Sequence, residues 1–178
     1  MTANTETFKK YKTNNIFIET GSYIGDGINQ AIEAGYNKII SIELGHQLYE
    51  GCVKRFKDND IVSLFQGDSS DVLNLILKDI NSPATFWLDG HWSGGITARG
   101  KLISPIMQEL DIIKNHTINT HTILIDDMRC WQHEWKDFSF GKDEIEQKVK
   151  QINDKYIIEY VDGHIPNDIL VAYVKEIK

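Results

Sequence analysis

Short apolar runs alternate along this chain with longer segments in which apolar residues recur every three to four positions. The short runs predict β-strands, and the longer amphipathic segments predict helices. We expect strands at 16–19, 38–43, 61–66, 84–88, 121–126, 156–161 and 169–174. We expect helices at about 26–34, 46–57, 69–79, 103–115 and 142–153, after a lead-in segment at 1–15. This alternation indicates an α/β fold with a mostly parallel sheet and right-handed crossovers.

The sequence also predicts local features of single strands and helices. Val62–Phe65 is short and apolar and runs into Gly67 and Asp68, as expected for a buried parallel strand. Ser69–Asp71 offers N-cap side chains for the helix that follows. The last two strands are joined at 162–168 without a helix, so that pair is expected to be antiparallel. The whole of 1–178 is expected to form one domain.

Composition narrows the class of protein. With 178 residues, 41% apolar and 25% charged, the chain has the make-up of a globular domain. The net charge is −7 and no basic run occurs, so nucleic acid is not an expected partner. No apolar run approaches the ~20 residues of a membrane span, and the polar N-terminus lacks a signal-peptide core, which predicts no membrane partner and a cytoplasmic location. Cys52 and Cys130 lie far apart without metal-ligand spacing, which implies no disulfide and a reducing compartment.

The most informative segment joins the first strand to its helix. It reads IFIETGSYIGDG over 16–27, so apolar residues lead to Glu19 and then to glycines at 21, 25 and 27. Glycine is needed where the backbone takes a positive φ or approaches a ligand closely, and the next helix presents free N–H groups. Glu43 ends the second strand, where a carboxylate can accept hydrogen bonds from two ribose hydroxyls. The glycines do not follow the G-x-G-x-x-G spacing, and an ordinary turn without a nucleotide is the alternative.

Acidic side chains recur at the predicted strand ends. The carboxyl ends of parallel strands meet at one edge of a sheet, where ligands bind in open α/β folds. So many like charges would raise one another's pKa values, and we therefore expect a cationic ligand among them. The strand-end residues are Glu19, Thr20 and Gly21, then Glu43, then Gly67, Asp68 and Ser69, then Asp89, Gly90 and His91, then Asp126 and Asp127.

Asp89, Asp126 and Asp127 form a sharper subset of these residues. They follow the fourth and fifth strands, with no basic residue expected between them, and hard oxygen ligands of this kind suit Mg²⁺, Mn²⁺ or Ca²⁺. The alternative is that Asp127 caps the next helix and only Asp126 faces the site. His91 is the candidate general base, because an ordinary histidine pKa near 6.5 is matched to a hydroxyl that a metal has acidified. A structural role beside Asp89 is the alternative for His91.

The Gly-rich turn with Glu19 resembles motif I of the class I, Rossmann-like S-adenosylmethionine-dependent methyltransferases. Asp89 and Asp126–Asp127 resemble the metal-holding residues of their metal-dependent O-methyltransferases, of the catechol and sugar-modifying types. The resemblance covers residues 16 to about 130. It implies a doubly wound sheet of seven strands with the last antiparallel and helices on both faces, and it implies S-adenosylmethionine and Mg²⁺ or Mn²⁺ as cofactors. The cofactor contacts that it implies are Glu19, Thr20, Gly21, Tyr23, Gly25, Glu43 on the ribose, Asp68 and Ser69 near the adenine, and Asp89.

Aromatic and basic residues after strands four and five suggest the acceptor. Trp92 precedes a Gly-rich loop that contains Arg99, and Arg129 and Trp131 follow the fifth strand. Aromatic faces beside charged groups suit a sugar ring or a flat phenol, so we expect these four residues to contact the substrate. The alternative is that the tryptophans belong to the core.

Together these features favour a metal-dependent O-methyltransferase in which His91 and Asp89 are catalytic and the acceptor is a small molecule, a sugar or glycan. A homodimer is left open. One alternative is a nucleotide-sugar or NAD-dependent enzyme built on the same sheet. Another is a non-catalytic binding module that retains the fold.

Overall fold

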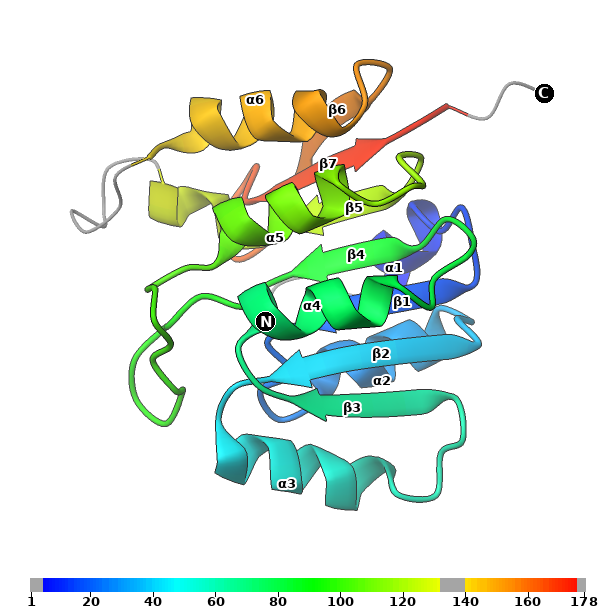
Figure 1. Ribbon diagram of the computed structural model, residues 1–178, viewed down its shortest axis with the longest axis vertical. Coiled ribbons are helices and arrows are strands. Elements are labelled where there is room, and N and C mark those ends of the chain that lie inside the picture. Colours follow the sequence, from blue (N-terminus) through cyan, green and yellow to red (C-terminus); the bar gives the residue numbers. More distant parts are fainter. Residues whose placement is uncertain (1–4, 132–139, 176–178) are drawn as a thin grey trace.

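The computed structural model describes residues 5–131 and 140–175, and its centre is a mixed sheet of seven strands (Figure 1). The strand order is β3-β2-β1-β4-β5-β7-β6. The first five strands in the chain are parallel, whereas β7 is antiparallel to both β5 and β6. The strands are β1 (Ile16–Thr20), β2 (Lys38–Glu43), β3 (Val62–Gln66), β4 (Thr85–Leu88), β5 (Thr122–Ile125), β6 (Ile157–Val161) and β7 (Ile169–Tyr173).

Helices cover both faces of the sheet, each with its own core. Apolar residues of α4, α5 and α6 pack on one face, and those of α1, α2 and α3 pack on the other. Figure 1 shows α4 and α5 in front of the sheet, with α1 and α2 behind it. The expected doubly wound fold is therefore confirmed. The helices are α1 (Thr5–Lys10), α2 (Asp26–Glu33), α3 (His46–Phe56), α4 (Ser69–Leu77), α5 (Ile106–Lys114), α6 (Lys142–Ile152) and the 3₁₀ turn η1 (Met128–Trp131).

Three local expectations are wrong. β3 is not a buried strand: among the described strands it forms the edge of the sheet and pairs with β2 alone, and it leaves Phe65 41% exposed. The N-cap of α4 is Asp68, whose side chain accepts a hydrogen bond from the Ser70 N–H, so the cap lies one residue before the expected set. Helix α5 begins at Ile106 rather than at 103, with Pro105 as its N-cap.

The register of the parallel strands brings their carboxyl ends to one level. Thr20 pairs with Leu88, and Leu88 pairs with Ile125. The residues that follow these three, including Asp89 and Asp126, therefore leave the sheet side by side. Among the described residues, no helix is both long and apolar enough to cross a membrane.

Candidate active site

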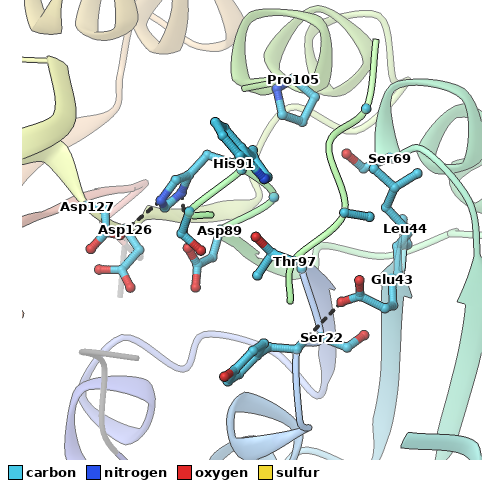
Figure 2. A pocket seen from close by; sticks show the side chains of 18 of the residues that line it. Ser22, Glu43, Leu44, Ser69, Asp89, His91, Thr97, Pro105, Asp126 and Asp127 are labelled. Atoms are coloured by element: carbon cyan, nitrogen blue, oxygen red, sulfur yellow. Dashed lines mark hydrogen bonds and ion pairs between the residues drawn. The ribbon is translucent and has the colours of Figure 1, made fainter. Parts of the chain in front are cut away.

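A cavity of about 510 Å³ opens at the carboxyl ends of the parallel strands. Figure 2 shows Glu43 on one side of it and Asp89, His91, Asp126 and Asp127 on the other. Of the residues expected at the site, the cavity is lined by Glu19, Gly21, Tyr23, Glu43, Asp68, Ser69, Asp89, His91, Trp92, Asp126, Asp127 and Arg129. Thr20, Gly25, Arg99 and Trp131 are not among the lining residues.

The Gly-rich turn has the backbone that its glycines predicted. Gly21 has a φ of 85°, and a Cβ there would lie 2.4 Å from the Asp89 carbonyl oxygen. Gly27, the second residue of α2, lies against the buried side chain of Glu19, and a Cβ at Gly27 would lie 1.9 Å from Glu19 Oε1. Any side chain at Gly21 or Gly27 would push the first strand end apart from its neighbours. The expectation of a positive φ in this turn is confirmed at Gly21 and Gly25, and the close approach to a ligand stays a prediction.

Glu43 is held rigidly at the end of β2. Its Oε2 accepts the Tyr23 N–H at 2.8 Å, and its Oε1 accepts the Gly45 N–H at 2.7 Å. Burial raises the pKa of Glu43, and these backbone donors offset part of the rise because they stabilise the carboxylate. Each carboxylate oxygen keeps a further lone pair for a ligand hydroxyl. The carboxylate is thus oriented by the two turns that flank the cavity.

Glu19 lies deeper, beneath the turn. Its Oε2 accepts a hydrogen bond from the Ser41 hydroxyl, and the side chain is 1% exposed. Burial raises the pKa of Glu19 to about 8, and the charges of Asp89 and Glu43 add to the rise. Glu19 therefore holds a proton at neutral pH, in contrast to an ordinary surface glutamate.

The loop between β4 and α5 crosses the cavity. Its base is pinned where the Trp92 N–H donates to the Ile103 carbonyl at 2.7 Å. Gly100 lies so close to Asp68 that a Cβ would be 2.9 Å from Asp68 Oδ2. The Arg99 guanidinium stacks over the Trp92 ring, 5.2 Å from the ring centroid. Trp92 thus lines the cavity, and Arg99 supports it from outside.

Asp89, Asp126 and Asp127 come together as expected. One carboxylate oxygen from each lies within 4.8 Å of the others, with Asp126 1% exposed. Burial raises the pKa of Asp89. Burial also opposes ionisation of Asp127, but His91 and Arg129 outweigh it and hold the pKa of Asp127 below its usual range. A set of carboxylate oxygens at this spacing fits a hard divalent cation such as Mg²⁺ or Mn²⁺.

His91 lies beside Asp89 as expected, but His91 and Arg129 also contact Asp127, whereas no basic residue was expected between the three carboxylates. His91 bridges two of these carboxylates: Nδ1 is 3.4 Å from Asp89 Oδ1, and Nε2 is 3.2 Å from Asp127 Oδ2. Burial lowers the pKa of His91, but Asp127 and Asp89 more than compensate and raise it to about 10. The ring is therefore an imidazolium at neutral pH, unlike the expected group of pKa near 6.5. Arg129 donates from Nη1 to Asp127 Oδ1 at 2.5 Å.

Asp168 is a residue of the site that the sequence pattern did not identify. It is 1% exposed, accepts the Arg129 N–H at 3.0 Å, and also pairs with the Arg129 guanidinium. Asp168 directly precedes β7, which is antiparallel and so starts at the edge where the parallel strands end. The antiparallel ending expected from the sequence could have revealed Asp168, because it brings the 162–168 connection to this edge of the sheet. His164 of the same connection lines the cavity.

Glu109 is the second residue that was missed. It lies in the first turn of α5, 1% exposed, and burial raises its pKa to about 7. Among the described residues, Glu109 Oε1 and the nearby Thr20 Oγ1 make no well-formed hydrogen bond, although Ser69 and Thr20 lie close enough to oppose part of the rise in pKa. Both flank Gly90, since a Cβ there would lie 3.2 Å from Glu109 Oε1 and 3.3 Å from Thr20 Oγ1. Helical periodicity alone gives no sign of this glutamate, because it occupies an apolar face.

For Trp131, the structure supports the alternative that the tryptophan belongs to the core. It is 7% exposed, belongs to the core on the α4–α6 face, and its ring lies edge-on to that of His91, with the centroids 6.5 Å apart. Asp127 is not only a helix cap, which was the alternative for this residue. Its side chain contacts His91 and Arg129. Asp127 takes a φ of 57°, a strained value for a residue other than glycine.

Solved methyltransferases share this architecture. An S-adenosylhomocysteine-bound methyltransferase from Podospora anserina matches with a TM-score of 0.64 and 11% identity, over 97% of this chain and 76% of that one. An O-methyltransferase from Bacillus cereus, in complex with S-adenosylhomocysteine, matches with a TM-score of 0.64 and 11% identity, over 96% of this chain and 78% of that one. A putative rRNA-methylase from Clostridium thermocellum matches with a TM-score of 0.57 and 15% identity, over 99% of this chain and 100% of that one.

No protein-family model matches the sequence, and a search of curated proteins finds no significant match. The strand order and the matches to solved structures nevertheless show that the chain has the Rossmann-like fold of the class I S-adenosylmethionine-dependent methyltransferases, as the resemblance implied. Identities this low show the fold alone. The fold does not select an acceptor, because one neighbour is an O-methyltransferase and another is a putative rRNA-methylase.

Proposed function

We propose that this protein transfers the methyl group of S-adenosylmethionine to a hydroxyl of a small acceptor, a sugar or glycan, with the help of Mg²⁺ or Mn²⁺. The observation that carries the proposal is one cavity with an oriented carboxylate, Glu43, on one side and the trio of Asp89, Asp126 and Asp127 on the other. The first is suited to a ribose and the second to a cation.

The nucleoside end of the cavity rests on the turn and on Glu43. Glu43 is fixed by the Tyr23 and Gly45 N–H groups, which leaves lone pairs aimed at the cavity for the ribose hydroxyls. Asp68 and Ser69 also line the cavity, and they would contact the adenine. The turn brings its backbone close because Gly21 has no side chain. These residues bind and orient the cofactor, and S-adenosylmethionine when bound supplies an electrophilic methyl group on a sulfonium.

The acceptor end rests on the carboxylate trio. Asp89, Asp126 and Asp127 would hold the divalent cation, which when bound would lower the pKa of an acceptor hydroxyl. His91 and Arg129 fix the orientation of Asp127, and His91 also fixes Asp89. The general-base role of His91 stays a prediction, and it requires His91 to give up the proton that it shares with the two carboxylates.

The sugar assignment rests on the walls of the cavity. Trp92 offers an indole face beside carboxylates, and its ring is stiffened by the stacked Arg99 guanidinium. Sugar C–H faces pack on such rings while their hydroxyls meet polar groups. A cavity of about 510 Å³ suits a small acceptor beside the cofactor better than a polymer chain.

A thermal-shift assay separates the proposal from its alternatives. S-adenosylmethionine and S-adenosylhomocysteine should raise the melting temperature of the protein, since a ligand that binds only the folded state stabilises it. NAD and UDP-glucose should leave it unchanged. A shift with NAD or UDP-glucose alone would favour the other enzyme class, and a shift with none of the four would favour the non-catalytic module.

A further inference from the structure

A second group of metal-ligating atoms lies against the carboxylate trio. His91, Asp127 and Cys130 each offer one ligand atom, and these atoms lie within 4.8 Å of one another. The residues come from three places in the fold, namely the end of β4, the end of β5 and the η1 turn. Figure 2 shows the His91 ring turned toward Asp127, with their interaction drawn as a dashed line.

The donor set of this group differs from that of the trio. An imidazole nitrogen, a carboxylate oxygen and a thiolate sulfur suit Zn²⁺ or Co²⁺, whereas three carboxylates suit Mg²⁺ or Mn²⁺. Zinc lies about 2.0–2.3 Å from such ligands, so the atoms of a tetrahedral site are roughly 3.5 Å apart. His91 Nε2 and Asp127 Oδ2 already meet that spacing at 3.2 Å. The Cys130 sulfur lies within 4.8 Å of its two partner atoms and would move inward to complete the site.

Neighbouring contacts hold the three residues in place. The Cys130 N–H donates to the Asp127 carbonyl at 2.8 Å, which fixes the turn that returns the thiol toward the carboxylate. Arg129 engages Asp127 Oδ1 and leaves Oδ2 facing His91. Cys130 is 3% exposed, while His91 and Asp127 line the cavity, so an ion would arrive from the cavity side.

We propose that His91, Asp127 and Cys130 bind one thiophilic divalent cation, Zn²⁺ above all, in a site distinct in donor type from the carboxylate trio. Binding releases the Cys130 thiol proton and the His91 ring proton to solvent, with no change of oxidation state. Because Asp127 belongs to both groups, a zinc ion here removes one ligand from the trio. Zinc and magnesium therefore compete for the protein, and this holds whether or not the protein transfers methyl groups.

The test is a titration of the purified full-length protein with Co²⁺, followed by absorption spectroscopy. The parent should bind cobalt with a thiolate-to-metal charge-transfer band, and Zn²⁺ should bleach that band. Cys130→Ser should lose the band and bind Zn²⁺ at least about tenfold more weakly. The matched control is Cys52→Ser, which changes the other buried cysteine, on the opposite face of the sheet. Asp126→Asn, which alters the trio alone, should keep the band, as should Cys52→Ser.

X-ray absorption of the parent protein with one equivalent of Zn²⁺ needs no variant and covers the case in which Cys130→Ser fails to fold. It should show one sulfur ligand at about 2.3 Å together with nitrogen or oxygen ligands. A shell of oxygen and nitrogen only would overturn the proposal. So would a cobalt band that survives in folded Cys130→Ser or disappears in Cys52→Ser.

Discussion

Both ends of the sheet contain buried polar groups, but the two ends differ in the charge and pairing of these groups. At the amino ends of the strands, neutral groups pair with one another: Thr13 with Thr122, Tyr36 and Asn14 with Thr85, and the Ala84 N–H with His121. At the carboxyl ends, acidic groups crowd together, among them Glu19, Glu109 and the trio Asp89, Asp126 and Asp127.

The pKa values of the buried titratable groups differ between the two ends in the same way. Burial lowers the pKa of His121 to about 4, so this buried histidine stays neutral under physiological conditions. Burial raises the pKa of Glu19 to about 8 and that of Glu109 to about 7, so the carboxyl end holds protons that solvent-exposed carboxylates would release. A satisfied neutral network rigidifies a fold, whereas crowded acids gain from a bound cation. We therefore expect the amino end to be structural and the carboxyl end to bind the ligand.

The largest expected effect comes from removing the cation that the carboxyl end is proposed to bind. Chelation with EDTA should abolish methyl transfer to the acceptor, and Mg²⁺ or Mn²⁺ should restore it. Asp126→Asn should lower the rate at least about 100-fold, because it removes one of three carboxylates from the trio. The control is Asp111→Asn, which affects a half-exposed residue paired with Lys148. Full activity after exhaustive chelation would leave the trio as polar contacts to substrate.

The next effect concerns the backbone that holds the carboxyl ends together. Gly21→Ala should lower the free energy of unfolding by about 3–5 kcal/mol, since the new Cβ meets the Asp89 carbonyl at a positive φ. Gly51→Ala is the matched control: it lies within α3 with nothing near its Cβ, and it should stabilise by about 0.5–1 kcal/mol. Urea unfolding measures both. Equal effects at the two positions would mean that the strand ends are loosely packed.

A pH-dependent effect tests the proton held by Glu109. Its folded pKa of about 7 lies above the ordinary value of 4.5, so the folded state binds more protons between these values. The stability that neutral Glu109 contributes is complete below 4.5 and is lost as the pH rises through 7. Glu109→Gln stays neutral, so the parent should lose roughly 2–3 kcal/mol relative to this variant between pH 5 and 8.

Urea unfolding at several pH values reveals the Glu109 effect as a changing gap between parent and variant. The exposed Glu50 provides the control, and Glu50→Gln should give a curve parallel to that of the parent. A parallel curve for Glu109→Gln as well would show that Glu109 is ionised throughout this range.

The smallest effect is expected at the amino end. Thr122→Val removes the 2.8 Å hydrogen bond to Thr13 within a buried strand, and it should destabilise by about 1 kcal/mol at every pH from 5 to 8. Thr120→Val, at an exposed position two residues earlier, should change stability by less than about 0.5 kcal/mol. A pH-dependent effect of Thr122→Val would contradict the claim that the buried polar network at the amino end is neutral.

The sequence predicted the alternation, the antiparallel ending and the meeting of strand-end carboxylates, because each depends on local periodicity or on a general property of parallel sheets. It did not predict that β3 is an exposed edge, since strand order depends on which crossovers form. Glu109 and Asp168 reach the site through tertiary packing, from a helix face and from the connection before β7. The imidazolium character of His91 was also missed, because it requires Asp89 and Asp127 on both sides of the ring.

The central claim is that Glu43 binds the ribose of S-adenosylmethionine, and calorimetry with S-adenosylhomocysteine tests it most directly. Glu43→Ala should weaken binding on the order of 2–4 kcal/mol, the worth of two charge-assisted hydrogen bonds. Glu50→Ala, which changes an exposed glutamate of α3, should bind as tightly as the parent. Unchanged affinity in Glu43→Ala, or no binding by the parent, would contradict the account.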